Sequence, residues 1–338
     1  MASRNISSHI SRKKTQITDI HPEIIATHIL TRIDIPSVAS MALTSKQFHA
    51  VCSEDKVWTK ICNSTWTSTK HPLVQNALST FPGGHCSFFS DSFPILHFNR
   101  DDNRCHDTTP VQRAEQLISA VDLMYKDKIL CSEVNVTDTS TEKNLDSIFK
   151  VEVPVDNKQS LSIPANCEDD EDMYMSDLKE NMTLSWIMID PTQKRAANIS
   201  SQRPVSVRPH WIDGDIEIKF AIIISEFVEV RIMVMLKWAD CGKSFVLSKL
   251  RLQLHDMDSM RLRGGKSVKI LQEAIQSGKR KKARKGEETR IHQKYLDMKW
   301  ERREEKQKRR RNKKKQLLVT VSVALIIVLV NLRFFVLE

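Results

Sequence analysis

The C-terminal end of the chain constrains its fold most strongly, because a long apolar run directly follows a basic one. Residues 317–337, from Leu317 through Val330 to Leu337, hold sixteen Leu, Ile, Val or Phe side chains and a single charge, Arg333. As a helix this run would be about 32 Å long, enough for a hydrocarbon core of about 30 Å. The pattern predicts a C-terminal transmembrane helix; a buried helix of a globular domain is the alternative.

The basic residues before the apolar run predict its orientation. They are Arg309, Arg310, Arg311, Lys313, Lys314 and Lys315. The positive-inside rule keeps such a flank cytosolic, where it also contacts anionic membrane lipid. We therefore expect a single-pass, tail-anchored protein whose body faces the cytosol or nucleoplasm, in the endoplasmic reticulum or nuclear envelope. The plasma membrane is the alternative membrane, and a nuclear location is the alternative if residues 279–285 act as a nuclear localisation signal.

The charge of the chain is concentrated in one segment. Its net charge is +10, but residues 278–315 alone contribute +13 and the first 277 residues carry −3. The basic character is therefore no evidence that the folded body binds nucleic acid, and we expect no nucleic-acid partner. In the segment that precedes the apolar tail, residues 279–316, we expect a charged, solvated helical stalk. Its apolar side chains are sparse: Ile291, Tyr295, Met298 and Trp300.

Motifs that would indicate an enzyme are absent. The eight glycines form no G-x-G arrangement, and Met260 occupies the first glycine position of a phosphate loop ending in Gly265-Lys266-Ser267. The seven cysteines show no paired spacing, which indicates reduced thiols. His85-Cys86 and Cys105-His106 could be considered as zinc ligands, but we favour loop residues because no second pair has finger spacing. We expect a non-catalytic chain without cofactor or metal.

A small helical unit is predicted near the N-terminus. Residues 1–18 are polar and expected to be disordered. Pro22 suits the first position of a helix, and Ile25, Ile29 and Ile33 recur every four residues. Three or four short helices then fit within residues 19–65. A unit of this size has little core of its own, which favours a partner that completes it.

The same residues resemble an F-box. The stretch Ile20-His21-Pro22-Glu23-Ile24-Ile25-Ala26-Thr27-His28-Ile29-Leu30-Thr31-Arg32-Ile33 is similar to its opening. Residues 36–52, with Phe48, resemble its middle, and Asp55-Lys56-Val57-Trp58 resembles its closing acidic-x-x-Trp. The chain departs from the family in one place: its opening Ile20-His21-Pro22 is one residue longer than the usual Leu-Pro.

Further segments resemble one plant subfamily of F-box proteins that end in a hydrophobic tail. They are residues 63–66, 79–85, 87–94, 118–122, 184–191, 194–198 and 203–207. The resemblance implies an adaptor that docks on the Skp subunit of a Skp–cullin–F-box (SCF) ubiquitin ligase and has no active site. Together with the helical periodicity it predicts Skp contacts at Pro22, Ile25, Ile29, Leu30, Val38 and Trp58. These side chains could equally hold the small core together.

The middle of the chain has the pattern of strands. Residues 149–153 and 216–220 alternate with period two, and 228–238 and 245–254 are apolar runs. After a connecting segment over 66–110, we expect a β-rich, antiparallel, sandwich-like domain over 111–278 that recognises the substrate. Trp186 and Trp211 are candidate binding aromatics, although buried packing is the favoured expectation for both.

The sequence thus predicts an α+β chain: a helical F-box over 19–65, a β-rich domain, a charged stalk and a transmembrane helix. The favoured function is a tail-anchored SCF substrate adaptor that promotes ubiquitination by proximity. Its expected partners are a Skp-type adaptor, through it cullin, a protein substrate and membrane lipid. Two alternatives stay open: a membrane-anchored scaffold without a role in degradation, and a basic nucleic-acid-associated protein of the nuclear envelope.

Overall fold

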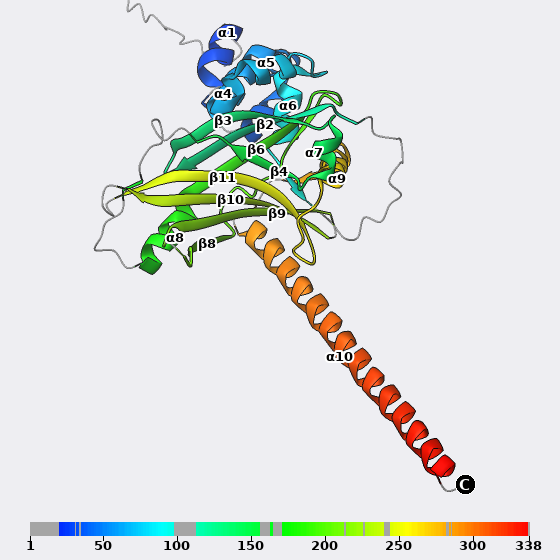
Figure 1. The fold of residues 1–338 in the computed structure, drawn as a ribbon. Coiled ribbons are helices and arrows are strands. Elements are labelled where there is room, and N and C mark those ends of the chain that lie inside the picture. The colour runs from blue at the N-terminus through cyan, green and yellow to red at the C-terminus, as the bar shows by residue number, and fades with distance from the viewer. Residues whose placement is uncertain are drawn as a thin grey trace, which may run out of the picture.

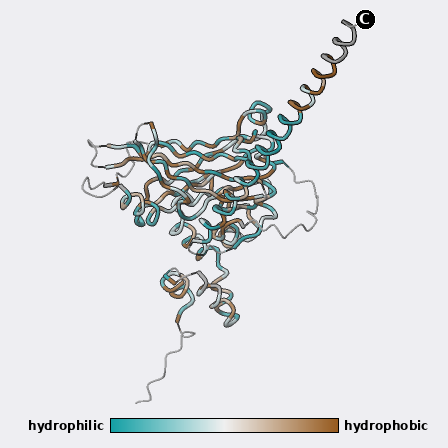
Figure 2. The backbone as a smooth tube through the Cα atoms, turned by 90° about the horizontal axis from the view of Figure 1, so that it is seen from below, coloured by the Kyte–Doolittle hydropathy of each residue, from teal (hydrophilic) through white to brown (hydrophobic). Residues whose placement is uncertain are grey.

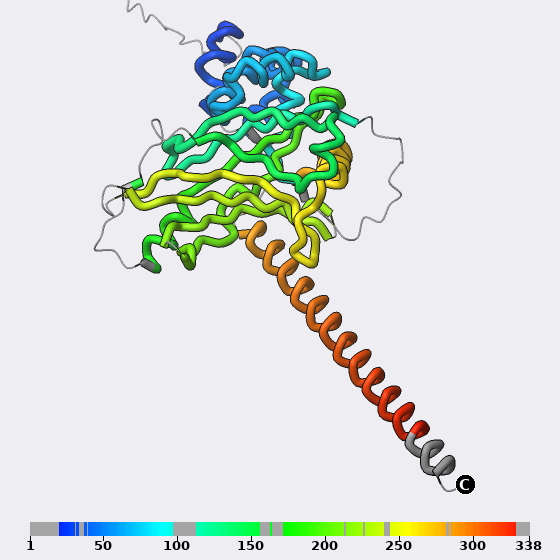
Figure 3. The backbone as a smooth tube through the Cα atoms, in the orientation of Figure 1, coloured from blue at the N-terminus to red at the C-terminus, as the bar shows by residue number. Residues whose placement is uncertain are grey.

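The chain forms three parts: a cluster of short helices at the N-terminus, a two-layered β-structure, and a long C-terminal helix (Figure 1). The computed structural model describes residues 20–30, 32–33, 35–97, 113–155, 163–164, 171–212, 214–225, 227–239, 244–281, 284 and 286–336. The predicted disordered segment 1–18 lies outside these residues. The helical cluster and the long helix lie at opposite ends of the β-structure (Figures 1 and 3).

The N-terminal helices follow the predicted order. They are α1 (Pro22–Ile24), the π-turn η2 (Ile25–Ile29), α2 (Ile35–Ala42), α3 (Lys46–Cys52) and α4 (Asp55–Thr65). Pro22 occupies the start of α1, and the hydroxyl of Ser45 accepts the Phe48 N–H at 3.2 Å to cap α3. Three further helices continue the cluster: the 3₁₀ turn η3 (Thr67–Lys70), α5 (Pro72–Leu78) and α6 (Gly84–Ser92). The predicted N-terminal helical region is confirmed.

The strands form two sheets, which confirms the β-rich prediction; the strand pairs are antiparallel as predicted, except that β1 pairs with β7 in parallel. The first sheet has the order β12-β1-β7-β6-β2-β3 and the second β4-β11-β10-β9-β8, with β5 on β11. The first contains β1 (Ile95–His97), β2 (Gln116–Tyr125), β3 (Lys128–Asp138), β6 (Met182–Asp190), β7 (Arg195–Asn198) and β12 (Lys279–Lys281). The second contains β4 (Lys150–Val153), β5 (Ile163–Pro164), β8 (Ser206–Pro209), β9 (Ile216–Ser225), β10 (Val228–Ala239) and β11 (Ser244–Asp256).

Both faces of the first sheet are buried along its central strands β2 and β6. Strand β2 is buried at nearly every position, although a strand with one wet face would alternate. One face, with Leu117 and Trp186, packs in the core between the two sheets. The other face, with Ile118 and Ile187, shares a hydrophobic cluster with the N-terminal helices. The helical unit therefore covers a sheet that would otherwise expose an apolar surface.

The two tryptophans singled out in the sequence have different environments. Trp186 is fully buried between the sheets, as expected. Trp211, in the turn between β8 and β9, is 88% exposed, so the expectation of buried packing is wrong for it. The cause is its position in a connection between strands, since such loops run over the surface.

Three further helices belong to the body: α7 (Glu142–Asp146), which contacts α9, α8 (Glu171–Asn181), which contacts β8, and α9 (Gly264–Ser277), which contacts β6, β7 and β9. Helix α9 is amphipathic and buries Val268, Leu271 and Ile275. The amide of Gln272 on the same helix donates to the buried Asp190 carboxylate at 2.8 Å, at the end of β6. This contact fixes α9 against the first sheet.

The predicted stalk divides into a strand and a docked helix. Lys279, Arg280 and Lys281 form β12, which pairs antiparallel with β1. Helix α10 runs from Glu287 to Val336. Tyr295 is buried against Ile223 of β9 and Met257, so the beginning of the stalk packs on the second sheet instead of being solvated throughout.

The far part of α10 carries the predicted membrane span, and here the prediction is wrong. Among the residues that the structure describes, no helix combines the length and apolar character required to cross a membrane. Leu337 lies outside the described residues. Figure 2 shows that α10 is hydrophilic beside the body and hydrophobic further out.

This correction extends to the localisation. The single-pass membrane location, in the endoplasmic reticulum or nuclear envelope, rested on the span and is withdrawn with it. The expected contact of Arg309, Arg310, Arg311, Lys313, Lys314 and Lys315 with membrane lipid loses its basis too. Their side chains are exposed on α10, and Arg309 lies 3.9 Å from Glu305 one turn earlier.

The buried His255 gives the fold a predicted acid sensitivity. Burial, and next the charge of Arg231, lower its pKa to about 4. The unfolded chain takes up this proton near pH 6.5, so stability is lost as pH falls from about 6.5 towards 4. Between pH 7 and pH 5, the free energy of unfolding should fall by about 1–2 kcal/mol less in His255→Gln than in the native chain, as measured by urea unfolding.

The control is His49→Gln, at an exposed position on α3. It should retain the native pH dependence. Equal losses in the native chain and His255→Gln would contradict the assignment of this acid sensitivity to His255.

Candidate functional site: the docking unit and its junction

The N-terminal helices pack around one part of the hydrophobic cluster that they share with the first sheet. Buried side chains of η2, α2, α3 and α4, and of Leu30 after η2, meet in it: Ile25, Ala26, Leu30, Val38, Phe48, Val51, Cys52, Val57, Trp58, Ile61 and Cys62. The indole N–H of Trp58 donates to the carbonyl of Cys52 at 2.7 Å, so its one polar atom is satisfied inside. Trp58 thereby ties the first turns of α4 to the end of α3.

The structure separates the six predicted docking residues into two groups. Ile25, Leu30, Val38 and Trp58 are buried in the core. Pro22 is exposed and Ile29 is half-buried, so these two lie at the surface. Whether any of them contacts a partner stays a prediction.

Two further apolar residues of these helices are exposed, and the sequence analysis did not single them out. Ile24 is 49% exposed at the end of α1, and Leu43 is 86% exposed just after α2. A signal for Ile24 existed, because consecutive helical residues point about 100° apart and Ile24 and Ile25 cannot both face one core. Pro22, Ile24, Ile29 and Leu43 are called the docking patch below.

The carboxylate of Asp55 fixes the docking unit, as the helices α1 to α4 are called here, to the start of α6. Asp55 accepts the backbone N–H of His85 at 2.8 Å, at the start of α6, and its other oxygen lies 2.9 Å from Nδ1 of the same histidine. Gly84 has φ +55°, and a Cβ there would lie 2.4 Å from the Asp55 carboxylate. Only glycine combines this conformation with this close approach. The acidic residue before Trp58 therefore has a structural role here.

A second carboxylate joins the helices to the first sheet. Asp122 of β2 is buried and accepts the N–H and hydroxyl of Ser68 at 2.9 and 2.5 Å, and the Ser132 hydroxyl at 2.7 Å. Burial raises the pKa of Asp122, while these hydrogen bonds oppose the rise. Nearby, the indole of Trp66 donates to the Ser185 hydroxyl at 3.1 Å.

A third carboxylate, that of Asp91, lies beside Arg280 of the basic segment 279–285. Asp91 of α6 pairs with Arg195 at 2.8 Å and lies 3.6 Å from Arg280. Arg280 also donates to the backbone carbonyls of Asp91, Ala196, Ile275 and Gly278. Because its guanidinium is bound inside the fold, Arg280 is not available as part of an exposed localisation signal or nucleic-acid patch.

The cysteines that the structure describes have the environment of packed side chains rather than of reactive thiols. Cys52, Cys62, Cys86 and Cys131 are free. Burial raises the pKa of Cys62 and of Cys131 to about 12, which removes the reactive thiolate at neutral pH. Within the described ranges, no three His, Cys, Asp or Glu side chains are grouped as a metal site. His85, considered as a zinc ligand, is bound to Asp55, and Cys105-His106 lies outside the described residues.

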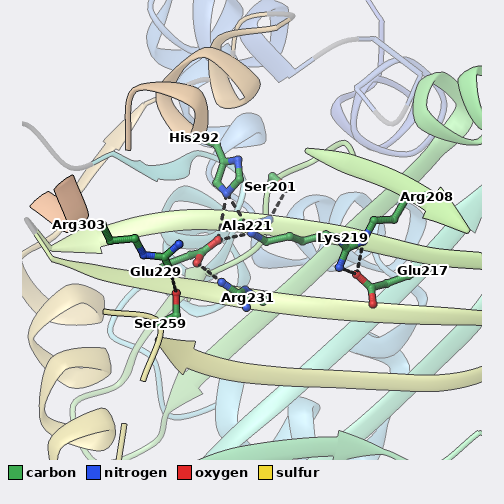
Figure 4. A network of polar contacts seen from close by, with 10 residues as sticks. All are labelled: Ser201, Arg208, Glu217, Lys219, Ala221, Glu229, Arg231, Ser259, His292 and Arg303. Atoms are coloured by element: carbon green, nitrogen blue, oxygen red, sulfur yellow. Dashed lines mark hydrogen bonds and ion pairs between the residues drawn. The ribbon is translucent and has the colours of Figure 1, made fainter. Parts of the chain in front are cut away.

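A buried ionic cluster fixes α10 to the second sheet (Figure 4). The carboxylate of Glu229 on β10 is fully buried and lies 2.5 Å from Lys219, 2.7 Å from Arg231 and 3.0 Å from His292 of α10. Burial alone would raise the pKa of Glu229, but the hydrogen bond from His292 and the two cations hold it below its usual value. Further along α10, Lys306 pairs with Asp258 at 2.6 Å.

Comparisons with known proteins agree with the helical unit. The F-box-like family model matches residues 22–64, which coincide with α1 to α4. The chain is 35% identical over 314 residues to F-box protein At3g44326 of Arabidopsis thaliana, covering 86% of this chain and 84% of the relative. It is 37% identical over 292 residues to F-box protein At2g27310 of the same plant, covering 82% and 84%.

A third relative is the probable F-box protein At2g36090 of Arabidopsis thaliana. It is 35% identical over 286 residues, covering 84% of this chain and 83% of the relative. No solved structure matches the chain. The similarity therefore extends through the β-structure, beyond the residues of the F-box-like model.

The contact between Gly84 and Asp55 can be tested by a matched pair of glycine substitutions. Gly84→Ala should destabilise the chain by about 1–3 kcal/mol, because it adds strain at positive φ and a clash with Asp55. Gly214→Ala has the strain without the clash, since φ is +70° and no atom lies within 4 Å of the added Cβ. Equal losses in urea unfolding would show that the Asp55 contact contributes nothing.

Proposed function

The chain belongs to the plant F-box protein family, and from this we propose that it is the substrate-recognition adaptor of an SCF-type ubiquitin ligase. Its first helices bind a Skp-type adaptor and through it a cullin. The β-structure binds the protein to be ubiquitinated. The chain carries out no chemistry itself; it raises the effective concentration of the target at the ubiquitin donor.

One observation carries the proposal. The residues matched by the F-box-like model form a helical unit on which the large apolar side chains of Ile24 and Leu43 are exposed. Large apolar side chains left exposed on so small a unit suit a protein-binding surface. Among these residues Leu43 supports the proposal most, because its side chain is 86% exposed.

The predicted contact residues take two roles in this proposal. Pro22 and Ile29 contact the Skp-type adaptor together with Ile24 and Leu43. The buried residues Ile25, Leu30, Val38 and Trp58 act indirectly, since they hold the patch in shape. A charge at a buried position would unfold the unit, whereas a charge in the patch would spare the fold and remove binding.

The docking patch gives a direct test. In Ile24→Glu/Leu43→Glu, two apolar contacts are lost and two charges must be desolvated, so the affinity for a Skp-type adaptor should fall by about 100-fold or more. Isothermal titration calorimetry measures the affinity, and circular dichroism checks that the fold is retained. The matched control is Leu73→Glu, at a 44%-exposed leucine of α5 outside the matched residues.

Unchanged binding by the folded double variant would contradict the docking patch. Failure of the native chain to bind any Skp-type adaptor would contradict the proposed function itself. If the native chain binds the adaptor and cullin but no protein is ubiquitinated in its presence, the non-degradative scaffold is favoured instead.

A further inference from the structure

The second sheet turns one face to the core and the other away from it. On β10, the side chains of Ile232, Val234 and Leu236 are fully buried in the core. Successive residues of a strand point to opposite sides, so Met233 and Met235 lie on the other face, which is called the outer face below. Residues opposite each other in neighbouring strands share a face, so the register assigns the remaining side chains of this sheet to one face or the other.

Positive charges outnumber negative ones on the outer face. Among the described residues of its strands, the register places on it Lys150, Arg208, Lys219, Arg231, Lys237, Lys249 and Arg251, but only the carboxylates of Glu152, Glu217 and Glu229. Asp256 is opposite the inward Val228 and belongs to the other face. Each of the three carboxylates already pairs with cations of this face, as Figure 4 shows for Glu217 and Glu229. The outer face therefore has a surplus of cations.

Helix α10 covers one end of the outer face, and the other end is exposed. At the covered end, Tyr295 packs on Ile223 of β9. At the exposed end, Lys249 of β11 is opposite Met235, two residues from Lys237 along β10, so the two lysines are diagonal neighbours. Both lysines are exposed, and neither has an ion-pair partner among the residues that the structure describes. The unbalanced positive charge is therefore concentrated at the exposed end.

Two methionines lie beside these lysines. Met235 is directly opposite Lys249, Met233 is directly opposite Arg251, and both methionines are half-buried. Their flexible thioether side chains can pack against apolar groups of many shapes. No Phe, Tyr or Trp of the described strands lies on the outer face, whereas single-stranded nucleic acids bind through such stacking side chains. Lysines interleaved with methionines therefore favour an acidic protein segment over a nucleic acid.

The outer face lies on the opposite side of the body from the docking unit (Figure 1). The N-terminal helices pack on one side of the first sheet, and the second sheet packs on its other side. A protein bound to the outer face would therefore leave the docking patch free. An adaptor needs this separation, because it must hold its target and its ligase partner at the same time.

We propose that the exposed end of the outer face binds an acidic segment of the protein that the adaptor recruits. Carboxylates of the segment pair with the ammonium groups of Lys237 and Lys249, and its apolar side chains pack on Met233 and Met235. This assignment deepens the proposed function and rests on it for the identity of the ligand as a recruited protein.

The probe is a random library of peptides of about 12 residues, selected on the full chain. The enriched peptides should be rich in Asp or Glu, and their affinity, measured by fluorescence anisotropy, should fall as the salt concentration rises. Lys237→Glu/Lys249→Glu should weaken their binding by roughly tenfold or more, because it turns two attractions into repulsions. Lys237→Gln/Lys249→Gln only removes the two charges and should give a smaller loss.

The matched control is Lys128→Glu/Lys143→Glu. It makes the same change in net charge at exposed lysines of β3 and α7, outside the second sheet. The control should retain most of the native affinity for the peptides. Circular dichroism checks that each variant is folded, and the glutamine variant stays informative if the glutamate variant misfolds.

Three results would overturn the assignment. They are enriched peptides that lack an acidic excess, native affinity in the folded lysine variants, and duplex DNA bound as tightly as the peptides, which would show a general attraction for polyanions. Binding of a Skp-type adaptor is measured on the same samples. A native chain that binds the peptides but no adaptor would refute the proposed function and leave the acidic-segment site standing. A chain that binds the adaptor but no peptide more tightly than about 100 µM would refute this site alone.

Discussion

The central strands β2 and β6 of the first sheet are apolar on both faces, and the rest of the structure depends on covering them. Ile118 and Ile187 point to one side, Leu117 and Trp186 to the other, and all four are buried. Neither side could be left to water without exposing a large hydrophobic surface. The second sheet covers one side and the N-terminal helices the other. The docking unit is therefore one layer of a single packed body.

Buried carboxylates determine how these layers are joined. Asp91 and Asp122 connect the helices to the first sheet, Asp190 connects α9 to it, and Glu229 connects α10 to the second sheet. Each takes partners from elements distant in sequence. Burying a carboxylate costs desolvation energy that its partners must offset, so these contacts contribute more to a unique arrangement than to net stability.

Periodicity predicted the elements better than their environments. The alternation of residues 216–220 correctly indicated a strand, and the spacing of Ile25 and Ile29 indicated a helix. However, residues 25–29 form a π-turn, and Ile29 is only half-buried although it follows the buried Ile25 by four residues. The role of Arg280 and the packing of Tyr295 depend on residues brought together by tertiary packing, which no local pattern contains. The apolar content of the tail predicted a membrane span, whereas no helix among the described residues is long and apolar enough to provide one.

The small size of the helical unit led to the expectation that a partner completes its core. Part of that partner is the chain's own first sheet, since Ile118, Ala120 and Ile187 lie in the same hydrophobic cluster as Phe48 and Trp58. This contact occupies one side of the unit and leaves Ile24 and Leu43 exposed away from that cluster. Since the side facing the sheet is already filled, a second protein can reach only the exposed side. The same packing that stabilises the unit therefore determines which of its surfaces is available for docking.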